Sequence, residues 1–217
     1  MTSPATMFAD RAEAGRRLGA LLEPLRDSGP VIVGMARGGV PVAREVARIL
    51  EAPLDVVVVR KLGHPRQPEL GLGALGEDGV RVVNEPLVHR LGVAASVVEE
   101  VTAREAVELD RRRRAYRGDR PPVALEGRVV VVVDDGLATG FTARAAVEVV
   151  RRRGARRVVV GAPVAAPEAV ASLRSVADDV VCVETVGRLF GISEWYLDFA
   201  QVADEEVTRI LAGEDEE

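Results

Sequence analysis

Sulfur, aromatic rings and long apolar runs are scarce in this sequence. Cys182 is the one cysteine among 217 residues, so an internal disulfide is excluded, and its apolar surroundings, VVCVETV, predict a buried strand position. Aromatic residues make up only 3% of the chain. Because no apolar run reaches about 18 residues and the first residues lack the features of a signal peptide, we expect a cytoplasmic protein with no membrane partner.

Positive charge is also in the minority. The chain has 29 Lys and Arg against 34 Asp and Glu, a formal net charge of −5 at pH 7, which argues against nucleic acid as a partner. Arginine runs at 111–114 and 151–153 lie late in predicted helices, where cations favour the helix dipole and the solvent. Hydrophobic residues account for 47%, which is ordinary for a globular protein with a sizeable core.

Apolar strands and amphipathic helices alternate along the chain. Strands are predicted at 30–35, 53–59, 128–134, 156–164 and 178–185. Helices are predicted at 8–25, 38–50, 95–116, 142–153 and 168–175. Valine-rich strands separated by helices predict an α/β fold with a Rossmann-like central parallel β-sheet flanked by helices, in a single domain spanning 1–217.

Three loops that leave predicted strands carry unusual residues. They are ARGG at 36–39, the Gly- and Pro-rich segment at 60–76, and DDGLATGFT at 134–142. In open α/β sheets, ligands bind beyond the carboxyl ends of the strands. We therefore expect the three loops to cluster at one edge of the sheet.

The loop DDGLATGFT combines a carboxylate pair with a candidate phosphate cradle. Gly140 allows close backbone approach, Thr139 and Thr142 add hydroxyls, and the next helix begins there with its amides pointing outward. Asp134 and Asp135 would repel a phosphate, so they need ribose hydroxyls or a hydrated Mg²⁺ ion as partners. The whole string predicts a bound ribose 5-phosphate, and the alternative is a plain turn in which Thr139 caps the helix.

The string VVVVVDDGLATGFT resembles the 5-phosphoribosyl-1-pyrophosphate (PRPP) signature of type I phosphoribosyltransferases. The order of the other elements agrees from about residue 8 to 185, and the whole chain is most similar to a group of poorly characterised bacterial members. The resemblance implies that Asp134 and Asp135 hold the ribose 2′- and 3′-hydroxyls. It implies that the 5′-phosphate is wrapped by Ala138, Thr139, Gly140, Phe141 and Thr142. Many members have a small residue in place of Phe141, so its ring must point away from the phosphate.

The resemblance also assigns roles to the other two loops. Arg37, Gly38 and Gly39 match the family's pyrophosphate loop, which often contains a cis peptide before the first glycine. Arg60 and Lys61 match basic residues that reach the pyrophosphate, and two cations ending a buried strand are costly unless anions come to them.

Two segments are expected to cover the site. Residues 61–79 lack periodicity and are predicted to be a mobile loop that closes as a flap. Within the flap, His64 is expected to be a solvent-exposed residue, with a role in the closed state as the alternative, and Glu69 is a candidate contact for the acceptor. A C-terminal hood is predicted at about 187–212. In the hood, Trp195 and Tyr196 either stack on a flat base or anchor the segment, whereas Phe199 is expected to anchor it.

The implied reaction moves ribose 5-phosphate from PRPP to a nitrogenous base or a related acceptor and releases pyrophosphate. The candidate catalytic residues are Arg37, Lys61, Asp134 and Asp135. The implied cofactor is Mg²⁺, held mainly by PRPP and water rather than directly by the protein, and a homodimer is implied by analogy alone. The alternative function is a non-catalytic regulator that senses PRPP or a nucleotide.

The acceptor is indicated only by one loop position. In the 6-oxopurine branch of the family, the residue before the loop threonine is usually an aspartate that can assist proton transfer at the base N7. This chain has Ala138 there, which is closer to the adenine-type and uracil-type pattern. We therefore expect little activity with hypoxanthine, guanine or xanthine, and acceptors other than nucleobases stay open.

Overall fold

The structure is a computed structural model that describes residues 7–118, 120–187 and 189–214. The strands of the described part form one sheet in the order β4-β3-β2-β1-β5-β6-β7. Their bounds are β1 Val31–Ala36, β2 Leu54–His64, β3 Gln67–Gly76, β4 Arg81–Val83, β5 Val129–Val133, β6 Arg157–Ala165 and β7 Asp179–Thr185. The strands from β2 to β7 in that order pair in parallel, which confirms the predicted α/β fold with a mostly parallel central sheet.

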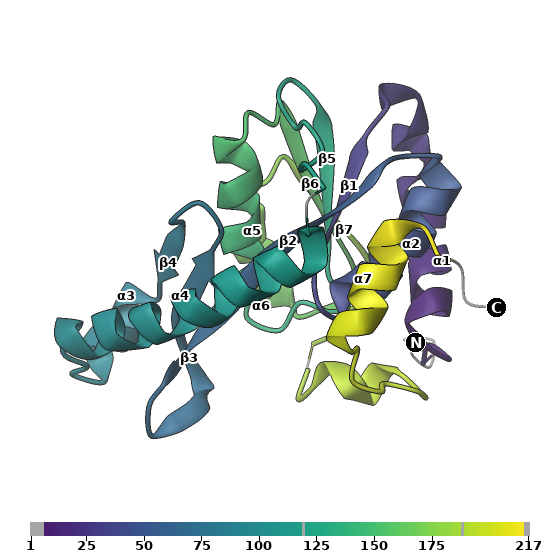
Figure 1. The fold of residues 1–217 in the computed structure, drawn as a ribbon. Coiled ribbons are helices and arrows are strands. Elements are labelled where there is room, and N and C mark those ends of the chain that lie inside the picture. The colour runs from purple at the N-terminus through teal and green to yellow at the C-terminus, as the bar shows by residue number, and fades with distance from the viewer. Residues whose placement is uncertain (1–6, 119, 188, 215–217) are drawn as a thin grey trace.

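Helices cover both faces of the sheet (Figure 1). Their bounds are α1 Arg11–Leu22, α2 Gly39–Leu50, α3 Glu85–Arg90, α4 Ala95–Arg117, α5 Phe141–Arg152, α6 Pro167–Leu173 and α7 Asp204–Ala212, with 3₁₀ turns at Glu23–Ser28 and Ile192–Trp195. In β5, Val131 and Val133 face α1 and α2, whereas Val130 and Val132 face α5. This alternation explains why the run of five valines forms a strand buried on both faces.

The prediction that the flap is a loop is wrong, because most of this segment forms strands. β2 continues through Lys61 to His64 and pairs with β3 as an antiparallel hairpin that projects from the body of the sheet (Figure 1). The hairpin turns at Pro65 and Arg66, and its ladder is irregular around Gly63. The predicted strand at 53–59 is therefore only the core half of β2, and the sheet is mixed at this edge.

The start of the described chain pairs with the hood. Phe8 forms a parallel bridge with Tyr196, and both side chains are buried in one apolar cluster. From there the chain leads to α7, which packs against α2, α4 and β2. No helix in the described ranges is long and apolar enough to cross a membrane.

Candidate active site

The loop after β5 is held in place by the neighbouring strand. Asp134 donates its backbone N–H to the carbonyl of Gly161 (3.1 Å), and buried Leu137 is bonded on both sides to the end of β6. Gly140, with φ +76°, then turns the chain into α5, a conformation that favours glycine. The ring of Phe141 is partly buried and packs against the core. Ala138 and Thr139 are exposed and Thr142 is half-buried.

The loop after β1 touches this acidic loop. A Cβ on Gly38 would overlap the carboxylate of Asp135, lying 2.7 Å from its Cγ. A Cβ on Gly39 would overlap the carbonyl of Val133 and lie 2.9 Å from the Cα of Asp134. The Ala36–Arg37 peptide is cis. Glycine is therefore required at 38 and 39 because the two loops approach so closely.

The third loop contributes differently from expectation. Arg60 lies within β2 and donates from Nε and Nη2 to Glu105 of α4, at 3.0 and 2.7 Å. Lys61 is exposed on the other face of the strand and runs beside Gly71 of β3. The structure thus shows contact between the loops at 37–39 and 134–135. The guanidinium of Arg60 is bound to Glu105 of α4.

The remaining flap candidates lie along the hairpin. His64 is half-buried at the end of β2, where its Nδ1 accepts from the N–H of Arg66 (3.2 Å), so the expectation of a solvent-exposed loop residue is wrong. The side chain of Glu69 lies outside the described part of the structure.

The hood contacts the acidic loop through Tyr196. Its hydroxyl donates to the backbone carbonyl of Asp135 (2.6 Å), and its ring lies between Phe8 and Phe199, with centroids 5.4 and 4.8 Å away. Because the ring is buried in this cluster, Tyr196 anchors the hood, which is the second of the two alternatives expected for it. Trp195 is half-buried against the same cluster, and Phe199 anchors the segment as expected.

Two further residues at the site were not expected from the sequence. Arg11 at the start of α1 donates from Nε to Asp135 Oδ2 (3.0 Å). Asp204 at the start of α7 accepts from the hydroxyl of Tyr116 (2.6 Å) and lies 3.5 Å from Nη1 of Arg37. No local signal marks either residue, because each contact joins segments far apart in the sequence.

Burial and mutual repulsion dominate the electrostatics of the acidic pair. Burial, followed by the charge of Asp135, raises the pKa of Asp134 well above its usual range. Burial also raises the pKa of Asp135, and the guanidinium of Arg11 opposes that rise. For Asp204, burial favours a higher pKa, but the hydrogen bonds from Tyr116 and Arg111 together with the charges of Arg111 and Arg112 lower the pKa. The pair is therefore suited to hydroxyl donors that favour its ionised form.

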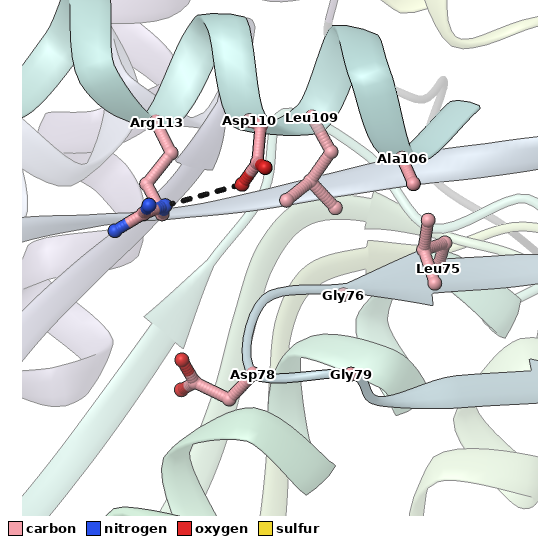
Figure 2. A pocket seen from close by; sticks show the side chains of 8 residues that line it. All are labelled: Leu75, Gly76, Asp78, Gly79, Ala106, Leu109, Asp110 and Arg113. Carbon is pink, nitrogen blue, oxygen red and sulfur yellow. Dashed lines mark ion pairs between the residues drawn. The ribbon is translucent and has the colours of Figure 1, made fainter. Parts of the chain in front are cut away.

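Two cavities lie near these elements. One of about 290 Å³ adjoins Arg37 and is lined by residues 201–205 of the hood. Another of about 370 Å³ lies between α4 and the β3–β4 turn, and Figure 2 shows the ion pair of Arg113 and Asp110 (3.5 Å) on its rim. The cavity in Figure 2 contains none of the predicted site residues, whereas the cavity of about 290 Å³ is lined by Arg37 and therefore adjoins the candidate site.

The acidic pair offers few carboxylate oxygens to a metal ion. In the described part of the chain, no three His, Cys, Asp or Glu side chains are grouped to hold an ion. Asp135 already uses one carboxylate oxygen for Arg11, and Asp134 Oδ1 accepts from the N–H of Asp135 (2.9 Å). A Mg²⁺ ion that enters with phosphate oxygens and water as its ligands fits this donor set, because such an ion needs few protein ligands.

Comparison with known proteins agrees with this geometry. A family model described as a phosphoribosyl transferase domain matches residues 12–196. A Mycobacterium tuberculosis protein, named "Putative phosphoribosyl transferase" in two strains, is 46% identical over 205 residues. Those residues make up 94% of this chain and 46% of the relative, so the chain spans about half the length of the curated relatives it matches.

Two further comparisons are shorter or structural. The uracil phosphoribosyltransferase of Agrobacterium fabrum is 41% identical over 61 residues, which is 28% of this chain and 29% of that protein. The crystal structure of TT1426 from Thermus thermophilus superposes with a TM-score of 0.80 at 45% identity, covering 96% of this chain and 99% of the other. The matched domain, the relatives and the joined loops at 37–39 and 134–142 together show that this chain belongs to the phosphoribosyl transferase family.

Proposed function

We propose that this chain transfers the 5-phosphoribosyl group of PRPP to a nitrogen acceptor and releases pyrophosphate in a Mg²⁺-dependent reaction. The observation that carries the proposal is the close contact of Gly38 and Gly39 with Asp134 and Asp135. In this contact a carboxylate pair lies beside a glycine loop, next to the amino end of α5. Family membership supports phosphoribosyl transfer in general.

The ribose and the phosphate would be bound by different groups of the protein. Asp134 and Asp135 would accept hydrogen bonds from the 2′- and 3′-hydroxyls, because ionised carboxylates are acceptors only. The backbone amides from Thr139 to Thr142, with the positive end of the α5 dipole, would hold the 5′-phosphate. Anchored at both ends, the ribose would present C1 in a fixed orientation.

Bond making and breaking would occur at C1. The bond from C1 to the pyrophosphate oxygen breaks and its electron pair leaves with the pyrophosphate. A lone pair of the acceptor nitrogen then forms the new C1–N bond, and that nitrogen gives up its proton to the solvent or to pyrophosphate. Arg37 and Lys61 would neutralise the leaving charge. Bound Mg²⁺ would supply further charge neutralisation on the pyrophosphate.

Lysine and arginine are not chemically equivalent at position 61. Lys61 is the single lysine among the chain's 29 basic residues. An ammonium is a compact point charge on a flexible stem, whereas a guanidinium is a planar fork. A lysine on the hairpin can therefore follow a leaving pyrophosphate that changes its position during the reaction.

A specific observation favours a second candidate, a regulator that binds PRPP or a nucleotide without catalysis. Arg37 pairs with Asp204 and Arg60 with Glu105, so both guanidiniums already have carboxylate partners. For catalysis, the pyrophosphate would have to displace these carboxylates from the guanidiniums or bind beside them. A sensor would need only the ribose and phosphate contacts.

Calorimetry with Mg²⁺–PRPP tests the site itself. The double variant Asp134→Asn/Asp135→Asn keeps the shape but loses both charges, so PRPP affinity should fall at least about tenfold, since hydrogen bonds to charged groups contribute about 1.5–3 kcal/mol each. Asp178→Asn is the matched control, because Asp178 lies just before β7, at the amino ends of the parallel strands. The acidic loop lies at their carboxyl ends. Unchanged affinity in a folded double variant would refute the assignment.

A pyrophosphate-release assay then separates the enzyme from the sensor. PRPP and Mg²⁺ are supplied with adenine, uracil, hypoxanthine, guanine, xanthine, amines and pyridine carboxylates. Because Ala138 has no carboxylate for a purine N7, we expect little turnover of the three 6-oxopurines, and adenine is the first base to test. Tight PRPP binding without turnover of any acceptor would favour the regulator.

A further inference from the structure

Arg11 joins three parts of the molecule. It is the first residue of α1, and its side chain is 12% exposed. Besides the bond from Nε to Asp135, Nη1 donates to the carbonyl of Ala200 in the hood (2.8 Å). The guanidinium carbon also lies 3.8 Å from the centroid of the Phe199 ring. One side chain thus contacts the N-terminal helix, the acidic loop and the hood.

Packing alone does not explain an arginine at this position. The neighbouring rings of Tyr196 and Phe199 would accept an apolar side chain, and burying a cation is costly unless its charge is met. Arg17 on the same helix provides a comparison. It lies 4.6 Å from the Phe8 ring, and its carboxylate partner on the sheet is Glu184 of β7, 3.6 Å away. The carboxylate of Asp135 is therefore the feature that distinguishes Arg11.

The contacts of Arg11 fix how Asp135 is presented. Arg11 binds Oδ2, Tyr196 holds the backbone carbonyl, and Gly38 closes off the side toward the pyrophosphate loop. A side chain held at several points is preorganised, so a ligand does not have to order it on binding. The oxygen Oδ1 is left as the acceptor that a ribose hydroxyl would meet.

We propose that Arg11 is a positioning residue that orients Asp135 for the ribose and couples ribose binding to the hood. This inference rests on the proposed function, because it needs PRPP as the ligand of the acidic pair. Hydroxyls that bind Oδ1 of Asp135 share the charge of the carboxylate with Arg11, so the bond from the guanidinium to Oδ2 weakens while the carboxylate keeps its position. Because the same guanidinium contacts Ala200 and Phe199, this change alters the environment of the hood residues.

The only tryptophan of the chain reports on this coupling. Trp195 lies in the 3₁₀ turn Ile192–Trp195, next to Tyr196 in the cluster that Arg11 covers. Its fluorescence, and its quenching by acrylamide, should therefore change when Mg²⁺–PRPP binds to the wild type. The readout needs neither turnover nor a known acceptor.

The test compares Arg11→Gln and Arg11→Lys with the matched control Arg17→Gln. For Arg11→Gln we expect PRPP affinity to fall about tenfold, the size of one charge-assisted hydrogen bond, and the Trp195 response to be lost. Arg11→Lys should recover part of the affinity through its charge but not the response, because an ammonium lacks the fork that spans Asp135 and Ala200. Arg17→Gln should keep both within about twofold, because the carboxylate partner of Arg17 is Glu184 of β7 rather than a residue of the acidic loop.

Three results would overturn the inference. The first is wild-type affinity and a wild-type Trp195 response in Arg11→Gln, and the second is an equal loss in Arg17→Gln. The third is a failure of the wild type to bind PRPP, which would refute the proposed function and this inference with it. If Arg11→Gln does not fold, Arg11→Lys decides, since a retained Trp195 response in that variant contradicts the coupling.

Discussion

Asp134 and Asp135 are adjacent acids in a half-buried loop, and the fold tolerates their repulsion. Since burial raises the pKa of Asp134, the folded state takes up its proton more readily than the unfolded chain does. The contribution of Asp134 to the free energy of unfolding is then fully present below the ordinary pKa near 4 and is lost as pH rises through the folded pKa. Above that pH the ionised, buried carboxylate of Asp134 destabilises the free protein.

Asp134→Asn should therefore stabilise the unliganded protein by about 1 kcal/mol at pH 7.5 while weakening PRPP binding. The amide oxygen can still accept the N–H of Asp135, so the loop keeps its local bond. Urea unfolding at pH 5 and pH 7.5 measures the effect, and the advantage of the variant should be larger at pH 7.5. A variant less stable than the wild type at both pH values would contradict the argument.

At the scale of elements, the β2–β3 hairpin is a paired segment with an open tip. Its backbone ladder protects Lys61, whereas Arg66 lies in the turn. Trypsin should therefore cut the free protein after Arg66 before it cuts after Lys61, because cleavage follows local opening. If the hairpin closes over the ligand, Mg²⁺–PRPP should slow the cut several-fold. Equal rates with and without PRPP would show that the hairpin is not a lid.

The hairpin was not predictable from side-chain periodicity. Gly63, Pro68, Gly71 and Gly73 interrupt any alternation of apolar and polar residues, yet such positions suit close backbone contact. A Cβ on Gly73 would overlap the carbonyl of Val82, and one on Gly63 would lie 2.5 Å from that of Pro68. The hairpin continues β2, whose first half is fixed in the core. Its pairing therefore depends on the position of β2 rather than on a residue pattern within the hairpin.

The core strands and the acidic loop were predictable because their signals are local. The valine run of β5 identifies a buried strand, and the loop residues follow it without interruption. The contacts that complete the site are not local. Arg11 and Asp135 are 124 residues apart, and Asp204 reaches Arg37 across most of the chain. A sequence pattern cannot single out Arg11 from Arg16 and Arg17 on the same helix.

At the scale of the whole molecule, Glu77 ties the hairpin to both helical layers. It is fully buried, accepts from the N–H of Val58 (2.7 Å), and binds Arg117 of α4 (2.5 Å) and Arg153 at the end of α5 (2.7 Å). Removing one member of a buried ionic group leaves the others without compensation, which costs about 3–5 kcal/mol. Glu77 is thus a structural residue rather than part of the site.

Glu77→Gln should lower the free energy of unfolding by about 3 kcal/mol and the melting temperature by about 6–12 °C. Asp78→Asn is the control, because Asp78 contacts the same Arg153 but is 47% exposed, so about 1 kcal/mol or less is expected. Circular dichroism melts check both variants. A loss in Glu77→Gln no greater than that in Asp78→Asn would show that the buried network is not needed for stability.

The contact between Arg37 and Asp204 has a consequence for how the protein is made. A ribosome releases the acidic loop sixty-odd residues before it releases the hood residue that reaches Arg37. At ordinary elongation rates that interval is roughly 3–12 s. For those seconds the nascent chain carries the loops at 37–39 and 134–142 without the hood, and the bridge from Phe8 to Tyr196 waits for the same late segment. Synthesis itself therefore orders assembly, because these two loops are made before the hood residues that contact them.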